Sequence, residues 1–229
     1  MNIEEFKKKY YPDGKLHDEF REKYNRMNTQ YLINGIKPDV LFLGDSITEA
    51  FETSLYFGDL GVIVNRGIGG EKTSHLKERV YADAADLSPK VCVVAEGVNN
   101  TAEIYFAKER KEEFPKEKIE ELLSGFSEDM NYITDVLLSA GIVPVICSVL
   151  PLGVVDERAD MILKENEILK DICNRKGIAY ADYYSALVEE DGKTLKDVTF
   201  GDDLHPHAEG YNVMAEILKP LLKEALCKR

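Results

Sequence analysis

The chain has 229 residues and a formal net charge of −13 at pH 7, with 44% hydrophobic and 31% charged side chains. This composition is typical of a soluble globular protein, and the length fits one large domain. The acidic balance argues against nucleic acid or an anionic membrane as a partner, because either needs a basic surface. No apolar run approaches the roughly 20 residues that span a bilayer, so membrane insertion is not expected.

Targeting and redox signals are weak throughout. The N-terminal sequence has neither the apolar core nor the small-residue cleavage site of a signal peptide. The four cysteines lie far apart and form no C-x-x-C pair, which argues against a disulfide framework or a metal cluster. We therefore expect a cytoplasmic protein that needs no metal and no cofactor. A leader that has been removed from the mature chain remains the alternative.

Five short apolar runs, rich in β-branched residues, predict strands that are buried on both faces. They cover residues 40–43, 62–64, 91–95, 142–149 and 178–180. Helical periodicity predicts an N-terminal helix that includes Phe20, Tyr24, Met27 and Tyr31. The same periodicity predicts helices over residues 119–140, 157–176 and 207–227, the last of which Pro220 should kink or interrupt.

Alternating strands and helices predict an α/β fold with a mostly parallel sheet that helices cover on both faces. We expect a single domain over residues 1–229, with residues 1–38 as a helical extension packed on it. Two roles remain open for this extension, bracing the sheet or forming a homodimer contact. Residues 101–118 are charged and irregular, and are either a solvated loop or helix extension, or a partial lid over a site.

Ligands of open α/β sheets bind beyond the carboxyl ends of the strands. Nearly all the polar, site-like residues lie at such positions or before the last helix, in segments 44–48, 65–73, 96–100 and 201–207. Any one of these segments alone is typical of a turn or a helix cap. The glycine-rich segment fails the phosphate-loop pattern because Glu71 stands where glycine is required, and Lys72 occupies the final glycine position of the dinucleotide pattern.

Taken together, the four segments contain every group that nucleophilic catalysis by a serine requires. Ser46 supplies the hydroxyl and His205 the base, and Asp202 stands three residues before His205, where it can accept the Nδ1 proton. The backbone N–H groups of Ser46 and Gly70 and the side-chain amide of Asn99 can act as donors to a tetrahedral oxyanion. No metal-ligand cluster competes with this interpretation.

The order Gly44-Asp45-Ser46, Gly70, Gly97-Val98-Asn99 and Asp202-Asp203-Leu204-His205 resembles the four sequence blocks of the SGNH, or GDSL-type, hydrolases. The resemblance extends from Asp39 to about Tyr211. It implies a flavodoxin-like, three-layer α/β/α sandwich around a five-stranded sheet. It also implies Ser46 as nucleophile, Asp202 and His205 as the rest of the triad, and Gly70 and Asn99 in the oxyanion hole.

Two positions depart from the family pattern. Asn100 stands where the third block often has aspartate, and Glu71 and Lys72 precede Thr73 where threonines often follow the second-block glycine. Because Asn99 is retained, we expect the chemistry to survive with an altered local hydrogen-bond network.

The resemblance implies a serine hydrolase that cleaves a carboxylic ester through an acyl-enzyme intermediate. We expect a small soluble substrate, a short-chain acyl or acetyl ester such as an acetylated sugar, in contact with Asp45, Asn100, Tyr105 and Phe106. Three alternatives remain. They are a thioesterase or lysophospholipase-type acylhydrolase, a catalytically silent binding module of the same fold, and a nucleotide-binding domain that uses residues 67–73.

Overall fold

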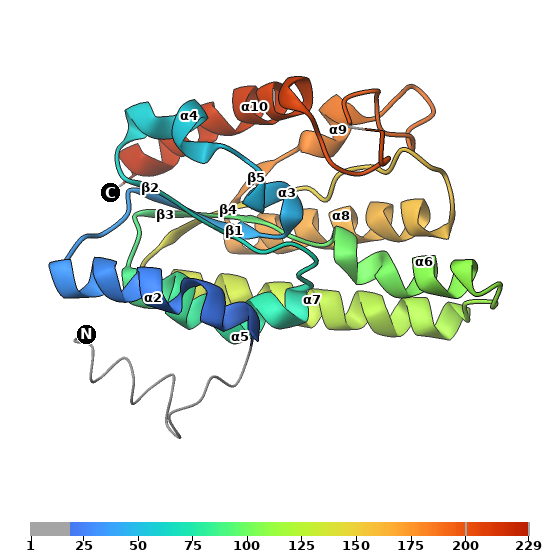
Figure 1. Ribbon diagram of the computed structural model, residues 1–229, viewed down its shortest axis with the longest axis horizontal. Helices are drawn as coiled ribbons and strands as arrows, with labels where there is room; N and C mark the ends of the chain where they lie inside the picture. Colours follow the sequence, from blue (N-terminus) through green and yellow to red (C-terminus); the bar gives the residue numbers. More distant parts are fainter. Residues whose placement is uncertain (1–18, 200, 229) are drawn as a thin grey trace.

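A computed structural model describes residues 19–199 and 201–228 (Figure 1). The first 18 residues of the expected N-terminal extension therefore lie outside the described residues. One sheet of five strands, all parallel, forms the centre of the molecule, in the order β2-β1-β3-β4-β5. The strands are β1 (Val40–Gly44), β2 (Ile63–Gly67), β3 (Val91–Ala95), β4 (Val143–Cys147) and β5 (Ala179–Ala181).

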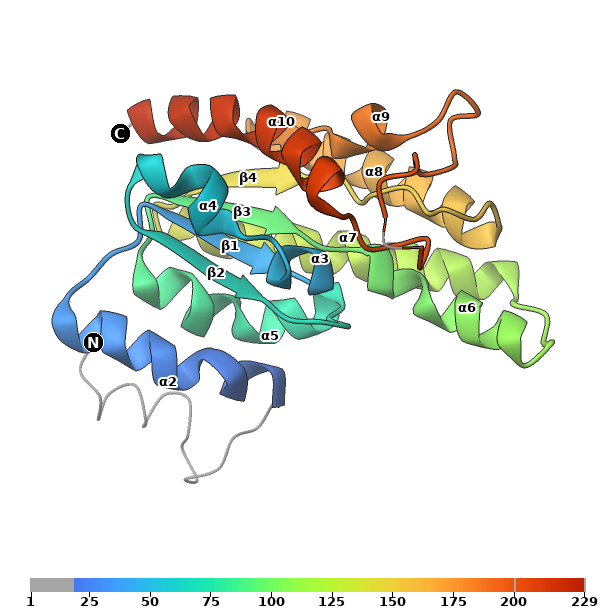
Figure 2. The ribbon, with the colours of Figure 1, turned by 45° about the horizontal axis from the view of Figure 1, so that its top comes forward.

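Helices cover both faces of this sheet, which confirms the predicted α/β fold. The long helices are α2 (Glu19–Asn34), α5 (Thr73–Asp83), α7 (Lys116–Ser139), α8 (Glu157–Lys176) and α10 (Ala208–Cys227). The short helices are α3 (Ser46–Glu49), α4 (Thr53–Phe57), α6 (Ala102–Glu109), α9 (Tyr183–Leu187) and the 3₁₀ turns η1 (Gly58–Leu60), η2 (Ala85–Leu87) and η3 (Val98–Thr101). In Figures 1 and 2, α2, α5 and α7 lie on one side of the sheet and α4 and α10 on the other.

Burial explains why the apolar runs form strands and the periodic segments form helices. Every residue of β1 is buried, because β2 and β3 pair with its two edges and helices cover both faces of the sheet (Figure 2). In α7 the side chains of Phe126, Met130, Ile133 and Leu137 recur at helical spacing and are at most 1% exposed. Helix α8 matches its predicted bounds, and α10 continues through Pro220 without interruption.

Two elements differ from their predicted form. The fourth strand was predicted over residues 142–149, but β4 ends at Cys147. Cys147 is the partner of Ala181, the last residue of β5, so the strand pairing stops there. The side-chain amide of Asn166 instead binds the backbone N–H and C=O of Val149, at 2.8 and 3.0 Å. Residues 101–118 contain the separate helix α6 and the first turn of α7, with a loop between them, so a plain solvated loop does not describe this segment.

Helix α2 packs against α5 on one side of the sheet. Its Tyr24 and Asn28 are buried, and the Tyr24 hydroxyl donates to the carbonyl of Gly67 at the end of β2 (2.5 Å). The described part of the extension thus braces the sheet, while its role in a homodimer stays a prediction. Across the described ranges, no helix combines the length and the apolar character that crossing a bilayer demands.

Candidate active site

Ser46 stands at the sharp junction between β1 and α3. Gly44 ends the strand, Asp45 caps the helix by accepting the Ile47 N–H at 2.9 Å, and Ser46 is the first helical residue. Its Oγ lies 2.8 Å from Nε2 of His205, although 159 residues separate the two in sequence. The loop before α10 therefore brings the predicted base to the predicted hydroxyl.

Asp202 holds the other side of the imidazole. Its Oδ2 lies 2.6 Å from His205 Nδ1, and its Oδ1 accepts the backbone N–H groups of His205 and Leu204, at 2.9 and 3.1 Å. Partial burial raises the pKa of Asp202, but the hydrogen bonds from these N–H groups and from the ring outweigh it and hold the pKa below its usual value. An ionised Asp202 favours the tautomer that carries its proton on Nδ1, which leaves Nε2 free to accept one.

The two other predicted oxyanion donors follow the strands on either side of β1. Gly70 lies in the exposed loop between β2 and α5 with φ +76°, a left-handed conformation that favours glycine. Asn99 lies in η3, after β3, and its Nδ2 is buried without a hydrogen-bond partner among the described residues. Because an unpaired buried donor costs about 1–3 kcal/mol, its retention here fits a group that is reserved for a ligand.

Asp45 and Asn100, predicted to contact substrate, lie in the buried framework behind these loops. Asp45 is 3% exposed and Asn100 is 7% exposed. Asn100 uses both ends of its amide on Thr73, accepting from the backbone N–H at 3.2 Å and donating to Oγ1 at 2.8 Å. This pair links the Asn99 loop to the start of α5.

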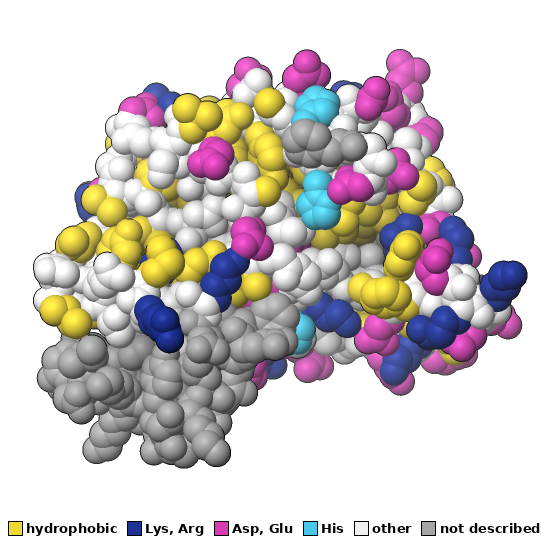
Figure 3. All heavy atoms as spheres, in the orientation of Figure 1, with side chains coloured by type: hydrophobic (Ala, Val, Ile, Leu, Met, Phe, Trp, Pro, Cys, Tyr) yellow, Lys and Arg dark blue, Asp and Glu magenta, His cyan; other side chains and the backbone are white. Residues whose placement is uncertain are grey.

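Tyr105 and Phe106 lie on the surface of α6, 41% and 54% exposed, with their rings edge to face at 5.5 Å. The guanidinium of Arg158 lies 5.1 Å from the Tyr105 ring, so this part of α6 contacts the start of α8. Figure 3 shows exposed hydrophobic side chains over α6, and a hollow between them and the loop that leads into α10.

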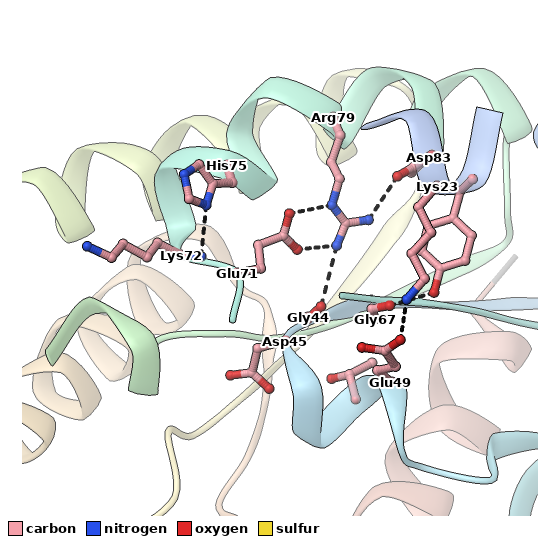
Figure 4. Close-up of polar contacts among 12 residues, drawn as sticks. Lys23, Gly44, Asp45, Glu49, Gly67, Glu71, Lys72, His75, Arg79 and Asp83 are labelled. Atoms are coloured by element: carbon pink, nitrogen blue, oxygen red, sulfur yellow. Dashed lines mark hydrogen bonds and ion pairs between the residues drawn. The ribbon is translucent and has the colours of Figure 1, made fainter. Parts of the chain in front are cut away.

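Several residues that support the glycine-rich loop were not predicted. Glu49 accepts the Gly69 N–H at 2.6 Å and pairs with Lys23 of α2 (Figure 4). A Cβ at Gly67 would collide with the backbone of Glu49, so glycine is required at this crossing. These contacts join residues 18 or more positions apart, and no local pattern in the sequence indicates them.

The fold and the hydrogen-bonded Ser46, His205 and Asp202 side chains are those of the SGNH hydrolase class, with an all-parallel sheet and a serine directly after β1. The model of the GDSL-like lipase/acylhydrolase family matches residues 42–213, and the chain belongs to this family. Membership implies an acylhydrolase that acts on an ester. No curated protein matches the sequence.

Solved structures share the fold at low sequence identity. A GDSL-like lipase from Bacteroides thetaiotaomicron is 22% identical, with a TM-score of 0.73 over 90% of this chain and 100% of that one. A candidate acylhydrolase from Bacteroides fragilis is 24% identical, with a TM-score of 0.71 over 90% and 96% of the two chains. An acetylxylan esterase from Geobacillus stearothermophilus is 18% identical, with a TM-score of 0.63 over 80% and 93%.

Proposed function

We propose that the protein is a serine esterase that works through an acyl-enzyme intermediate, with Ser46, His205 and Asp202 as its triad. The observation that carries this proposal is the continuous hydrogen-bonded chain from Ser46 Oγ through the imidazole to Asp202, with links of 2.8 and 2.6 Å. We further propose that residues 1–229 act as one catalytic domain, since a single hydrophobic core extends from β1 to α10.

In the first half of the reaction, Ser46 Oγ attacks the ester carbonyl carbon while His205 Nε2 takes the hydroxyl proton. The resulting oxyanion accepts hydrogen bonds from the N–H groups of Ser46 and Gly70 and from the Asn99 amide. The C–O bond to the alcohol then breaks, and the alcohol leaves with the proton from His205. Asp202 stabilises the imidazolium without taking its proton.

In the second half, water attacks the acyl-enzyme carbonyl as His205 accepts one of its protons. The same donors hold the second oxyanion. Its collapse breaks the bond to Ser46 Oγ, which regains a proton from His205, and the carboxylic acid leaves. Every proton is returned, so no cofactor is needed.

The preferred substrate is a short-chain or acetyl ester, and an acetylated carbohydrate is the first class to test. Behind the serine loop, a cavity of about 20 Å³ lined by Ile47, Val98 and Leu150 leaves no room for a deep acyl pocket there, and none of the triad residues lines it. A related fold acts on acetylxylan in the Geobacillus enzyme, which supports acetylated sugars. A larger cleft, of about 1230 Å³ between α6, α7 and α8, has none of the triad residues in its lining.

The test compares hydrolysis of p-nitrophenyl acetate, butyrate and octanoate, and of an acetylated xylo-oligosaccharide, by wild type and Ser46→Ala. We expect turnover only by wild type, with kcat/KM falling as the acyl chain lengthens. Equal activity of the two proteins would refute Ser46 as nucleophile. If neither is active, labelling with a fluorophosphonate decides: a labelled Ser46 indicates a different ester or a thioester, and an unlabelled one indicates a binding module.

A further inference from the structure

Arg79 of α5 is a fully buried arginine, and two of its three partners, Glu71 and Gly44, lie at the edge of the sheet that bears the site (Figure 4). Its Nε donates to Glu71 Oε1 at 2.6 Å, and its Nη2 pairs with the second Glu71 oxygen. Nη2 also lies 3.4 Å from the carbonyl oxygen of Gly44, and Nη1 pairs with Asp83 at 2.8 Å. The side chains of Arg79, Glu71 and Asp83 are all 0% exposed.

Two of these contacts reach the two loops that carry the backbone donors of the site. Gly44 ends β1, two residues before Ser46, and Glu71 directly follows Gly70. The pairing of β1 with β2 ends at Gly44 and Gly67, and the Ile68 N–H adds one more bond to the Gly44 carbonyl, at 2.8 Å. Beyond that point, the serine segment and the glycine-rich loop are joined by the Glu49 carboxylate, which accepts the exposed Gly69 N–H at 2.6 Å, and from the buried side by the Arg79 guanidinium.

Fold stability alone does not explain a buried ion cluster at this place. Burying ions costs several kcal/mol each, and apolar side chains of similar volume often stabilise a protein equally well. What a guanidinium adds is a rigid planar fork, which fixes the direction and the spacing of a paired carboxylate. Oxyanion donors must be held in place in advance, because misplacement by about 1 Å can lower a rate by roughly 100-fold.

We propose that Arg79, through Glu71 and the Gly44 carbonyl, is a positioning residue that holds the Gly70 N–H at the correct place relative to the Ser46 N–H. This role rests on the proposed function. Glu71 is the residue that breaks the phosphate-loop pattern, and this role accounts for a carboxylate at that position.

The test uses two isosteric variants that remove one buried carboxylate each from the same arginine. Glu71→Gln leaves one acceptor and places an amide N–H against an Arg79 N–H, which breaks the paired contact with the glycine-rich loop. Asp83→Asn makes the same change on the opposite side of Arg79, away from both loops. There Asp83, one turn further along α5, also accepts a hydrogen bond from Asn28 of α2. The second variant is therefore the matched control for loss of a buried charge.

Two quantities are measured on each folded variant, the kcat and KM for p-nitrophenyl acetate and the inhibition constant of butylboronic acid. The boronic acid adds to Ser46 Oγ and places an anionic oxygen among the oxyanion donors, so its inhibition constant reports their placement. That constant does not depend on the fraction of molecules that are folded. A purely structural role of Glu71 would therefore leave it unchanged.

We expect Glu71→Gln to lower kcat about 10- to 100-fold, with a change in KM below about threefold. The inhibition constant of butylboronic acid should rise by a factor similar to the loss in kcat. Asp83→Asn should keep kcat and the inhibition constant within about threefold of wild type. An inhibition constant equal to wild type in Glu71→Gln, or equal losses in both variants, would overturn the inference. If Glu71→Gln does not fold, Arg79→Lys replaces it, because lysine keeps the charge but cannot hold both Glu71 oxygens and the Gly44 carbonyl.

Wild type itself separates this inference from the proposed function. A wild type that neither hydrolyses the ester nor reacts with a fluorophosphonate refutes both. A reactive wild type, combined with an unchanged inhibition constant in Glu71→Gln, refutes the positioning role alone.

Discussion

Asp202 binds His205 at two places at once, with Oδ2 2.6 Å from the ring Nδ1 and Oδ1 2.9 Å from the backbone nitrogen. The double contact is possible because the chain between them turns back on itself, with Asp203 in the left-handed conformation at φ +60°. One carboxylate thereby fixes both the loop and the orientation of the imidazole that it carries.

Replacing this carboxylate by an amide should separate the two contacts. In Asp202→Asn the Oδ1 atom can still accept the backbone N–H groups, but Nδ2 faces Nδ1 and favours the tautomer protonated on Nε2, which cannot accept the Ser46 proton. We expect kcat for p-nitrophenyl acetate to fall by about 10²–10⁴-fold, with little change in the melting temperature. The control is Asp203→Asn at the adjacent exposed position, since asparagine tolerates the left-handed conformation. Equal activity in both variants would refute the role of Asp202.

Much of the fold and the central part of the site could be predicted from the sequence. The strands are recognisable because a sheet covered on both faces needs continuous apolar runs such as Val40–Gly44. The polar segments that follow these runs lie at one sheet edge because parallel strands all end there. The three-residue spacing of Asp202 and His205 is a local pattern, and the structure contains the contact that this spacing suggested.

The supporting contacts could not be predicted, because they depend on pairs that meet only in the folded chain. Glu71 and Arg79 are eight residues apart, and nothing in the sequence indicates that both are buried together against the Gly44 carbonyl. Beyond the end of β4, the backbone N–H and C=O of Val149 are hydrogen-bonded by the side chain of Asn166. This residue lies in α8, a helix that follows later in the chain.

Asn99 and Asn100 are adjacent in sequence and should differ in what their loss affects. The Asn99 Nδ2 has no partner among the residues described, so Asn99→Ala should not lower the unfolding free energy, whereas it should lower kcat by about 10²–10³-fold. The Asn100 amide makes two buried bonds to Thr73, so Asn100→Ala should lower the unfolding free energy by about 1–3 kcal/mol. Urea unfolding and kcat of both variants check the pair. An Asn99→Ala variant with unchanged kcat would refute its role as an oxyanion donor.

Asp45 should make the stability of the protein depend on pH. Burial raises its pKa to about 6, even though the N–H groups of Ile47 and Thr48 and the charge of His205 act in the opposite direction. The protonated Asp45 carboxyl therefore contributes fully to stability below its pKa in the unfolded chain, near 3.8. This contribution is lost as the pH rises through about 6. Asparagine keeps the helix cap and cannot ionise. We expect the unfolding free energy of Asp45→Asn, relative to wild type, to increase between pH 4 and pH 7 and then level off.

Urea unfolding of wild type and Asp45→Asn at pH 4, 5, 6, 7 and 8 measures this difference. The same substitution at the exposed Asp203 controls for general effects of removing one negative charge from an acidic protein. If the difference in unfolding free energy between Asp45→Asn and wild type stayed constant from pH 4 to pH 8, the raised pKa of Asp45 would be refuted.

The exposed aromatic pair of α6 should influence which ester the protein prefers. Phe106 is 54% exposed, and half-burial of its ring against an acyl chain would contribute about 1 kcal/mol, which corresponds to about fivefold in kcat/KM. We expect Phe106→Ala to lower the ratio of kcat/KM for octanoate to that for acetate by roughly this factor, without a loss of stability. Leu55→Ala, at a 78% exposed leucine of α4, removes similar apolar surface elsewhere and should leave the ratio unchanged. If both variants keep the wild-type ratio, Phe106 is ordinary surface and does not form a wall of the substrate site.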